Sequence, residues 1–258
     1  MTTVRTRREP PSFRRVEVAR TALLTPHLRR VTLAGPELAG LPEALPAASV
    51  RLLLPRSGEV VLPDWNGNEF RYGDGARPPI RTLTPRRIAG DEVDVDIVLH
   101  GSGTLSSWAA KVEVGAPAAL AGTGRGYTVD PEARSLVLAG DETALPAIAT
   151  VLEALPATLG VAVVVEVARP DARLDLPVPS GSQLTWHDLP GGAAPGAALV
   201  DAVMALPLDG TARVWAAGEA AAMQRIRHHL FEDVGLPRDQ AVVRGYWKHG
   251  RSADSGAD

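Results

Sequence analysis

Two patterns of hydrophobic and polar residues divide the chain near residue 131. Before that point, short segments alternate apolar with polar residues, and Gly and Pro interrupt them, which is typical of an antiparallel barrel or sandwich. In VDVDIVL, for example, Val93, Val95 and Ile97 fall on one face and Asp94 and Asp96 on the other. The strands expected here are FRRVEVAR, LRRVTLAG, SVRLLLP, RTLTP and DEVDVDIVLHG.

After about Glu132, nearly continuous apolar runs such as SLVLAG and VAVVVEVA alternate with helical segments. The further strands expected are QLTWHDL, ARVWAAG and AVVRGYW; the helices follow SLVLAG, cover AALVDAVMAL and run from about Glu219 to Asp233. Strands alternating with helices predict a doubly wound parallel sheet. We therefore expect an antiparallel β barrel over residues 1–131 and an α/β domain over 132–258. The cleft between them, at the carboxyl ends of the parallel strands, is the expected site.

Composition removes several classes of function. The 258 residues include no cysteine, which excludes disulfides, thiolate catalysis and cysteine-bound metal centres. A net charge of −3 gives no sign of a nucleic-acid partner, and the histidines show no metal-binding spacing. No apolar run approaches the ~20 residues of a membrane span, and the N-terminus lacks the apolar region of a signal peptide. We expect a cytoplasmic protein without membrane insertion.

The segment IRTLTPRR combines hydroxyl and guanidinium groups on a predicted strand. Alternation places Arg81, Leu83 and Pro85 on one face and Thr82 and Thr84 on the other. A guanidinium is a forked partner for phosphate, and a threonine hydroxyl or its backbone N–H could reach a ring nitrogen of a planar cofactor. An ordinary strand with a solvated arginine is the alternative.

A second candidate segment is HGSGTLSSWAAKV, in which a strand gives way to small residues and then to an amphipathic start. Thr104 or Ser106 could cap a helix there, and the free N–H groups of its first turn would attract a pyrophosphate. The alternative is a plain cap with Trp108 in the core.

Two further segments, LAGDETALPAI and WAAGEAAAM, each pass from strand through Gly to helix. The first lacks the G-x-G-x-x-G glycines, and Asp141 and Glu142 put negative charge where a phosphate loop avoids it. Asp141 or Thr143 is instead a candidate helix cap. Gly218, in the second segment, allows close approach of another backbone or a ligand ring.

The last candidate segment, RGYWKHGR, places two aromatic residues among cations. Tyr246 and Trp247 lie between Arg244 and the pair Lys248 and Arg251. Such a group can stack on a ring or hold an anion. An exposed, charged chain end is the alternative.

In this order, these segments resemble the siderophore-interacting proteins, flavin-dependent ferric-siderophore reductases of the ferredoxin–NADP reductase superfamily. The resemblance covers nearly the whole chain, with GDETALPAI and GYWKHG as its most specific motifs and HGSG…SSWA in support. It implies that NADH or NADPH passes hydride to FAD, which releases electrons singly to siderophore-bound iron(III). The iron(II) product binds the siderophore oxygens more weakly and is released for intracellular iron assimilation.

The resemblance also implies residue roles. Arg81 would contact the pyrophosphate or ribityl part of FAD, and Thr84 the flavin ring, on a strand that also carries Thr82. The pyrophosphate segment would comprise His100, Gly101, Ser106 and Ser107. The nicotinamide side would comprise Asp141, Glu142, Thr143, Gly218 and Glu219, with Tyr246 and Trp247 also at the cofactors. Lys248 and Arg251 would attract the anionic ferric siderophore.

One residue departs from the family pattern. The flavin motif of the family usually has an aromatic residue, typically Tyr, where this chain has Leu83. A leucine packs but loses the π contact, which is worth about 0.5–1.5 kcal/mol beyond area burial. We therefore expect weaker FAD retention, by roughly tenfold at most.

Several alternatives stay open at this level. The acceptor could instead be free flavin or a quinone, or the chain could be a siderophore- or flavin-binding protein with weak or no turnover. NADH, NADPH and a ferredoxin are all candidate donors: Glu166 could bind a ribose diol, whereas Arg169 and Arg173 could take a 2′-phosphate. We expect a monomer.

Overall fold

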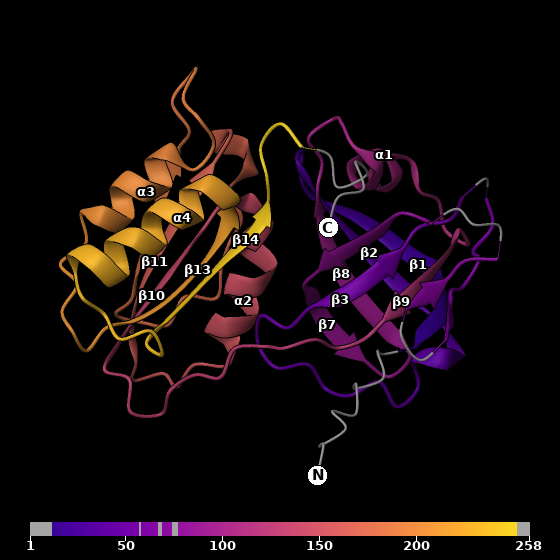
Figure 1. Cartoon of the computed structure of the whole chain (residues 1–258), viewed down its shortest axis with the longest axis horizontal. Helices are drawn as coiled ribbons and strands as arrows, with labels where there is room; N and C mark the ends of the chain where they lie inside the picture. Colours follow the sequence, from indigo (N-terminus) through magenta and orange to yellow (C-terminus); the bar gives the residue numbers. More distant parts are fainter. Residues whose placement is uncertain (1–11, 57, 67–68, 74–76, 252–258) are drawn as a thin grey trace, which may run out of the picture.

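The structure is a computed structural model that describes residues 12–56, 58–66, 69–73 and 77–251. It contains an antiparallel barrel sheet and a five-stranded parallel sheet that is flanked by helices, side by side (Figure 1). Both predicted classes of domain are confirmed. No helix among the described residues is long and apolar enough to cross a membrane.

The barrel sheet has seven antiparallel strands in the order β6-β3-β9-β1-β2-β8-β7. Their bounds are β1 (Phe13–Thr25), β2 (Leu28–Ala34), β3 (Val50–Leu53), β6 (Ile80–Leu83), β7 (Pro85–Ala89), β8 (Glu92–Val98) and β9 (Pro117–Ala121). Smaller elements are η1 (Pro36–Leu38), the hairpin of β4 (Asp64–Trp65) with β5 (Phe70–Arg71), and α1 (Thr104–Lys111). Strand β9 was not predicted, because PAALA is buried almost throughout and does not alternate.

The expected strand RTLTP is two strands, β6 and β7, and only Thr84 separates them. They form opposite edges of the seven-stranded sheet, so the sheet curls to bring its two edges together at Thr84. The predicted alternation is therefore wrong beyond Leu83: Thr84 and Pro85 are both buried, although they are consecutive. An uninterrupted strand would have buried only one of them.

The barrel interior follows the pattern of β8. Val93, Val95 and Ile97 are buried there together with Val31 and Leu33 of the neighbouring β2. The alternating apolar residues therefore fill the core as predicted.

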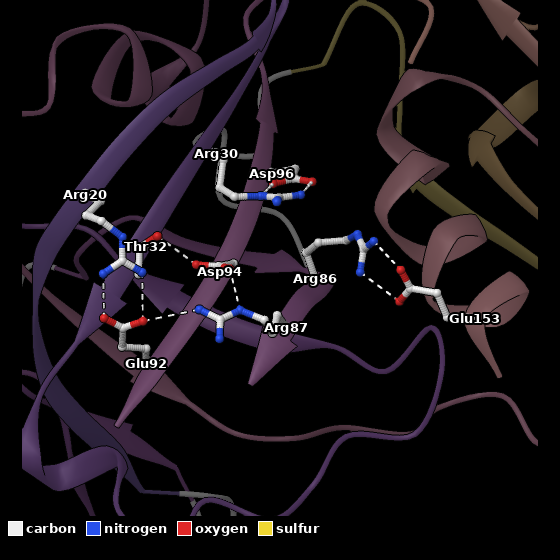
Figure 2. A network of polar contacts seen from close by, with 9 residues as sticks. All are labelled: Arg20, Arg30, Thr32, Arg86, Arg87, Glu92, Asp94, Asp96 and Glu153. Carbon is white, nitrogen blue, oxygen red and sulfur yellow. Dashed lines mark hydrogen bonds and ion pairs between the residues drawn. The ribbon is translucent and has the colours of Figure 1, made fainter. Parts of the chain in front are cut away.

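The opposite face of β8 is polar, yet it is buried as well. Asp96 accepts from the Nε of Arg30 at 2.7 Å, and Asp94 accepts from the Oγ1 of Thr32 at 2.7 Å and the Nε of Arg87 at 2.9 Å (Figure 2). These partners satisfy both carboxylates, so Asp94 and Asp96 are buried without being left unpaired.

The second sheet has five parallel strands in the order β12-β11-β10-β13-β14. Their bounds are β10 (Ser135–Gly140), β11 (Gly160–Val167), β12 (Gln183–Asp188), β13 (Arg213–Glu219) and β14 (Ala241–Trp247). The helices are α2 (Leu145–Glu153), α3 (Ala197–Met204) and α4 (Ala220–His228), with η2 (Glu142–Ala144), η3 (Pro170–Ala172) and a π turn, η4 (His229–Asp233). The strand order reverses between β10 and β13, which defines the switch point where such sheets bind ligands.

The helices cover both faces of this sheet. Helix α2 packs in one core, and α3 and α4 pack in another on the opposite face. In Figure 1, α3 and α4 lie together in front of the sheet and α2 lies on the side of the barrel.

Helix α2 also joins the two domains. Arg86 of β7 forms a bidentate ion pair with Glu153 of α2, with N–O distances of 2.9 and 2.5 Å (Figure 2). The Oγ1 of Thr150 accepts from the backbone N of Ala47 at 3.0 Å. Ala47 and Tyr127, which follow strands of the barrel, are buried in the same core as α2. The domains thus share polar and apolar contacts.

Candidate functional site

The junction of β6 and β7 carries the first group of predicted residues. Arg81 is half-buried and donates to the carbonyl of Ile80 at 3.0 Å, whereas Thr82 is exposed. Leu83 packs against the barrel core, and Thr84 is buried where the sheet edges meet. Alternation on β6 therefore leaves Thr82 facing outward while Leu83 adds apolar contacts.

The prediction that Thr104 or Ser106 caps α1 was wrong. The N-cap is Gly103, whose φ of +73° brings the chain into the helix one residue before Thr104. Ser106 therefore lies within the first turn, and its Oγ accepts from the backbone N–H groups of His100 at 3.0 Å and Gly101 at 3.3 Å. The serine fixes the loop to the helix instead of capping it.

This helix start has the donors that a diphosphate needs. The N-cap of α1 is a glycine, which has no side chain to occupy this end of the helix. The start of a helix directs backbone N–H groups and the positive end of its dipole toward an anion. Gly101 has a φ of +80° with open space where a Cβ would stand, and His100 and Ser107 are exposed beside it. The residues present fit the pyrophosphate of FAD.

At the switch point, Asp141 is buried and accepts four hydrogen bonds. Its Oδ1 accepts from the backbone N of Thr143 at 2.9 Å and from the Oγ1 of Thr143 at 2.6 Å. Its Oδ2 accepts from the backbone N of Glu219 at 2.9 Å and from the Nε1 of Trp247 at 2.7 Å. Burial raises the pKa of Asp141, although these donors oppose the shift. A Cβ on Gly218 would lie 2.6 Å from Oδ2, so this position has no room for a side chain. Asp141 caps η2, as one reading of the sequence predicted.

Glu219, at the end of β13, is a second buried carboxylate. Its Oε2 caps α4 by accepting from the backbone N–H groups of Ala221 at 2.6 Å and Ala222 at 3.0 Å. Its Oε1 accepts from the backbone N of His249 at 3.1 Å. Burial raises the pKa of Glu219, but the backbone donors outweigh it and leave the pKa below its usual value.

A bulge ends the pairing of β13 with β14. Gly218 pairs with Gly245 and Glu219 with Trp247, which leaves Tyr246 as an extra residue. Bulges of this kind redirect side chains next to active sites.

The redirected Tyr246 connects the two domains. Its ring meets Trp215 edge to face, with centroids 6.4 Å apart. Burial raises the pKa of the Tyr246 phenol, and the neighbouring Thr84 side chain lowers it in part. The end of the parallel sheet therefore lies against the junction of β6 and β7.

The predicted cations lie in one turn beyond β14. The backbone N of Arg251 donates to the carbonyl of Lys248 at 3.2 Å, and Gly250 adopts a φ of +71° within this turn. Both side chains are exposed. The fold therefore brings Lys248 and Arg251 together, and their role in binding stays a prediction.

Glu142 lies near a barrel loop that sequence reasoning did not single out. Its Oε1 accepts from the backbone N of Ala168 at 2.7 Å. Burial raises the pKa of Glu142, whereas the nearby His27 lowers it. The Nε2 of His27, which lies between β1 and β2, is 3.2 Å from the Oδ1 of Asp171 in η3. No local motif marks His27, because its partners are more than a hundred residues away.

Glu166 does not have the predicted role of a ribose ligand. It is buried and caps α3, since its Oε1 accepts from the backbone N of Gly196 at 2.6 Å and its Oε2 from that of Leu199 at 3.0 Å. Arg173, a candidate for a 2′-phosphate, is ion-paired with Asp188 at 2.8 Å. The helix start takes both oxygens of Glu166, so they are not available to a nucleotide.

A curled antiparallel barrel with a helix start suited to a diphosphate, followed by a parallel α/β domain, defines a flavoprotein of the ferredoxin–NADP reductase type. Family models agree: residues 17–127 match the siderophore-interacting FAD-binding domain, and residues 133–250 match the siderophore-interacting protein model. The chain belongs to the siderophore-interacting protein family, and FAD is its cofactor.

Individual proteins show the same relationship. The chain is 30% identical over 252 residues to the ferric vibriobactin reductase ViuB of Vibrio cholerae, covering 94% of this chain and 92% of that protein. The crystal structure of a siderophore utilization protein from T. fusca is 35% identical, with a TM-score of 0.83 over 95% of both chains. Phthalate dioxygenase reductase shares only the fold, with 14% sequence identity and a TM-score of 0.61. The match covers 92% of this chain and 68% of that chain.

Proposed function

We propose that this chain is an FAD-dependent reductase that passes electrons from NADH or NADPH to ferric siderophores in the cytoplasm and so releases iron(II). The observation that carries the proposal is the bidentate ion pair of Arg86 with Glu153, which sets the junction of β6 and β7 against helix α2 of the parallel-sheet domain. The similarity to a ferric vibriobactin reductase supports the choice of acceptor.

On the barrel side, Arg81 and the segment from His100 to Ser107 would hold the diphosphate of FAD. Thr82, Leu83 and Thr84 would lie along the flavin. Bound FAD supplies the change from two-electron to one-electron transfer. Thr84 would offer a hydrogen-bonding group whose position its burial restricts.

On the α/β side, the nicotinamide residues would be Asp141, Glu142, Thr143, Gly218 and Glu219. The carboxylate of Asp141 is fully engaged by protein donors, so its part is to fix its neighbours. Tyr246 and Trp247 would lie by the cofactors. Residues 1–131 would form the FAD-binding domain, and residues 132–258 would form the NAD(P)H-binding domain.

The test is anaerobic iron(II) release from several ferric siderophores, with NADH, NADPH and a reduced ferredoxin compared. We expect release with at least one donor, trapped as a coloured iron(II) chelate. A purified protein that binds FAD and siderophore but gives no iron(II) with any donor would favour the second candidate, a binding protein with weak or no turnover. Leu83 is the observation behind that candidate, because it removes a stacking contact with the flavin.

A further inference from the structure

The two residues that flank Lys248 are both held by buried carboxylates. The Nε1 of Trp247 donates to the Oδ2 of Asp141 at 2.7 Å, and the backbone N of His249 donates to the Oε1 of Glu219 at 3.1 Å. The segment beyond β14 is therefore attached to the ends of β10 and β13, one attachment on each side of Lys248.

These attachments also restrict the backbone around Lys248. The rings of Trp247 and His249 meet edge to face, with centroids 6.3 Å apart, so both side chains lie on the same side of the segment. Lys248 lies between these two anchored residues, and its side chain is exposed. In Figure 1, this segment leaves β14 on the side of the barrel. The turn that Arg251 closes on the carbonyl of Lys248 adds a second cation.

The two carboxylates form one rigid unit. The backbone N of Glu219 donates to the Oδ2 of Asp141 at 2.9 Å. Thr143 donates to the Oδ1 of Asp141, and the start of α4 donates to the Oε2 of Glu219. Asp141 and Glu219 are only 8% and 4% exposed, and within the described part of the chain none of their hydrogen bonds involves Lys248. They can therefore fix the backbone of Lys248 without pairing with its ammonium group.

We propose that Asp141 and Glu219 are positioning residues that hold Trp247 and His249 so that Lys248 presents its charge to an anionic ferric siderophore. The inference rests on the proposed function, whose substrate site it specifies. Fixing the flanking residues before the ligand arrives reduces the ordering that binding would otherwise require. The exposed ammonium then favours anionic complexes over cationic ones.

The test measures binding separately from turnover. Equilibrium dialysis of the FAD-loaded protein would use ferric enterobactin, an anionic tris-catecholate, and ferrioxamine B, a cationic trihydroxamate. Trp247→Phe keeps an aromatic ring but removes the donor to Asp141, and Asp141→Asn replaces one of its two acceptor oxygens with a donor NH2 group. Lys248→Met gives the reference loss of charge. Glu166→Gln is the matched control, since it alters a buried helix-capping carboxylate of the same domain.

We expect Trp247→Phe, Asp141→Asn and Lys248→Met each to weaken ferric enterobactin binding by about three- to tenfold, and not to weaken ferrioxamine B binding. Adding Lys248→Met to Trp247→Phe should cause little further loss, because both act through one ammonium group. Glu166→Gln should lower the Tm without changing either Kd.

The inference is overturned if Trp247→Phe binds ferric enterobactin as the wild type does, if its loss adds fully to that of Lys248→Met, or if the wild type does not bind this complex. Anaerobic turnover is assayed in parallel. Binding that follows the expected pattern without iron(II) release would support the inference and overturn the reductase function.

Discussion

At the scale of single residues, the switch point is closely packed around the carboxylate of Asp141. Gly218 leaves room for the Oδ2 of Asp141, and the indole N–H of Trp247 supplies a donor that no other aromatic residue has at that point. Leu83, by contrast, is a residue that packs well yet lacks the ring usual in the family. These positions give two predictions.

Gly218→Ala should destabilise the protein by roughly 1–3 kcal/mol, because the added Cβ would lie 2.6 Å from the Oδ2 of Asp141 and displace its hydrogen bonds. Gly210→Ala is the matched control, since its Cβ would have no neighbour within 4 Å. Chemical denaturation measures both variants. Equal stability of the two would show that the carboxylate can move aside without loss.

Leu83→Tyr should tighten FAD binding by up to roughly tenfold, because an aromatic ring adds a stacking contact with the flavin. Titration of the apoprotein with FAD, followed by flavin fluorescence, gives the Kd. Leu83→Met controls for a change of shape without an aromatic ring. If Leu83→Tyr and the wild type hold FAD equally, the departure from the family pattern has no consequence for the cofactor.

At the scale of elements, the outer face of β8 is held to its neighbours by charge. Glu92 accepts from Arg20 at 2.6 Å and from Arg87 at 3.2 Å, so one carboxylate links β1, β8 and β7 (Figure 2). The hydrogen bond with Arg20, followed by weaker contributions from Arg87, lowers the pKa of Glu92 to about 2. Acid should therefore weaken this face.

The direction of the pH effect on stability follows from the lowered pKa of Glu92. The pKa of Glu92 is lower in the folded state than its usual 4.5, so its stabilising contribution is complete above about pH 4.5 and is lost as the pH falls through about 2. Arg20→Met should raise the pKa of Glu92, as measured by NMR titration, and flatten the loss of stability in this range. An unchanged pKa in Arg20→Met would contradict the assignment of the ion pair.

At the scale of the whole molecule, the two domains meet through several separate contacts. Arg86 pairs with Glu153, the backbone of Ala47 donates to Thr150, and Ala47 is buried in the core of the α/β domain. This combination holds α2 against the barrel and thereby sets the distance between the junction of β6 and β7 and the switch point.

Arg86→Met should loosen this contact more than it destabilises either domain. The pair is partly exposed, so the loss of stability should be about 0.2–1 kcal/mol, while backbone hydrogen exchange in α2 should increase. Arg173→Met, which removes the exposed pair with Asp188 inside one domain, is the control. Equal exchange in α2 for both variants would show that the ion pair does not restrain the domains.

The sequence alone determined the classes of both domains, because alternation and continuous apolar runs are local consequences of which faces are buried. It also determined nearly all strands and helices, the missed ones being β9, whose alanine-rich segment does not alternate, and the short β4 and β5. The motifs that indicated the family are also local, because the glycine turns and the aromatic pair each lie within a short run of consecutive residues.

Only the tertiary structure decided what those motifs contact. Thr84 separates two strands instead of lying within one, Gly103 rather than Thr104 or Ser106 caps α1, and Glu166 caps a helix thirty residues away. The bond from Trp247 to Asp141 spans 106 positions. Such partners are set by the curl of one sheet and the strand order of the other, and neither property is encoded in the spacing of neighbouring residues.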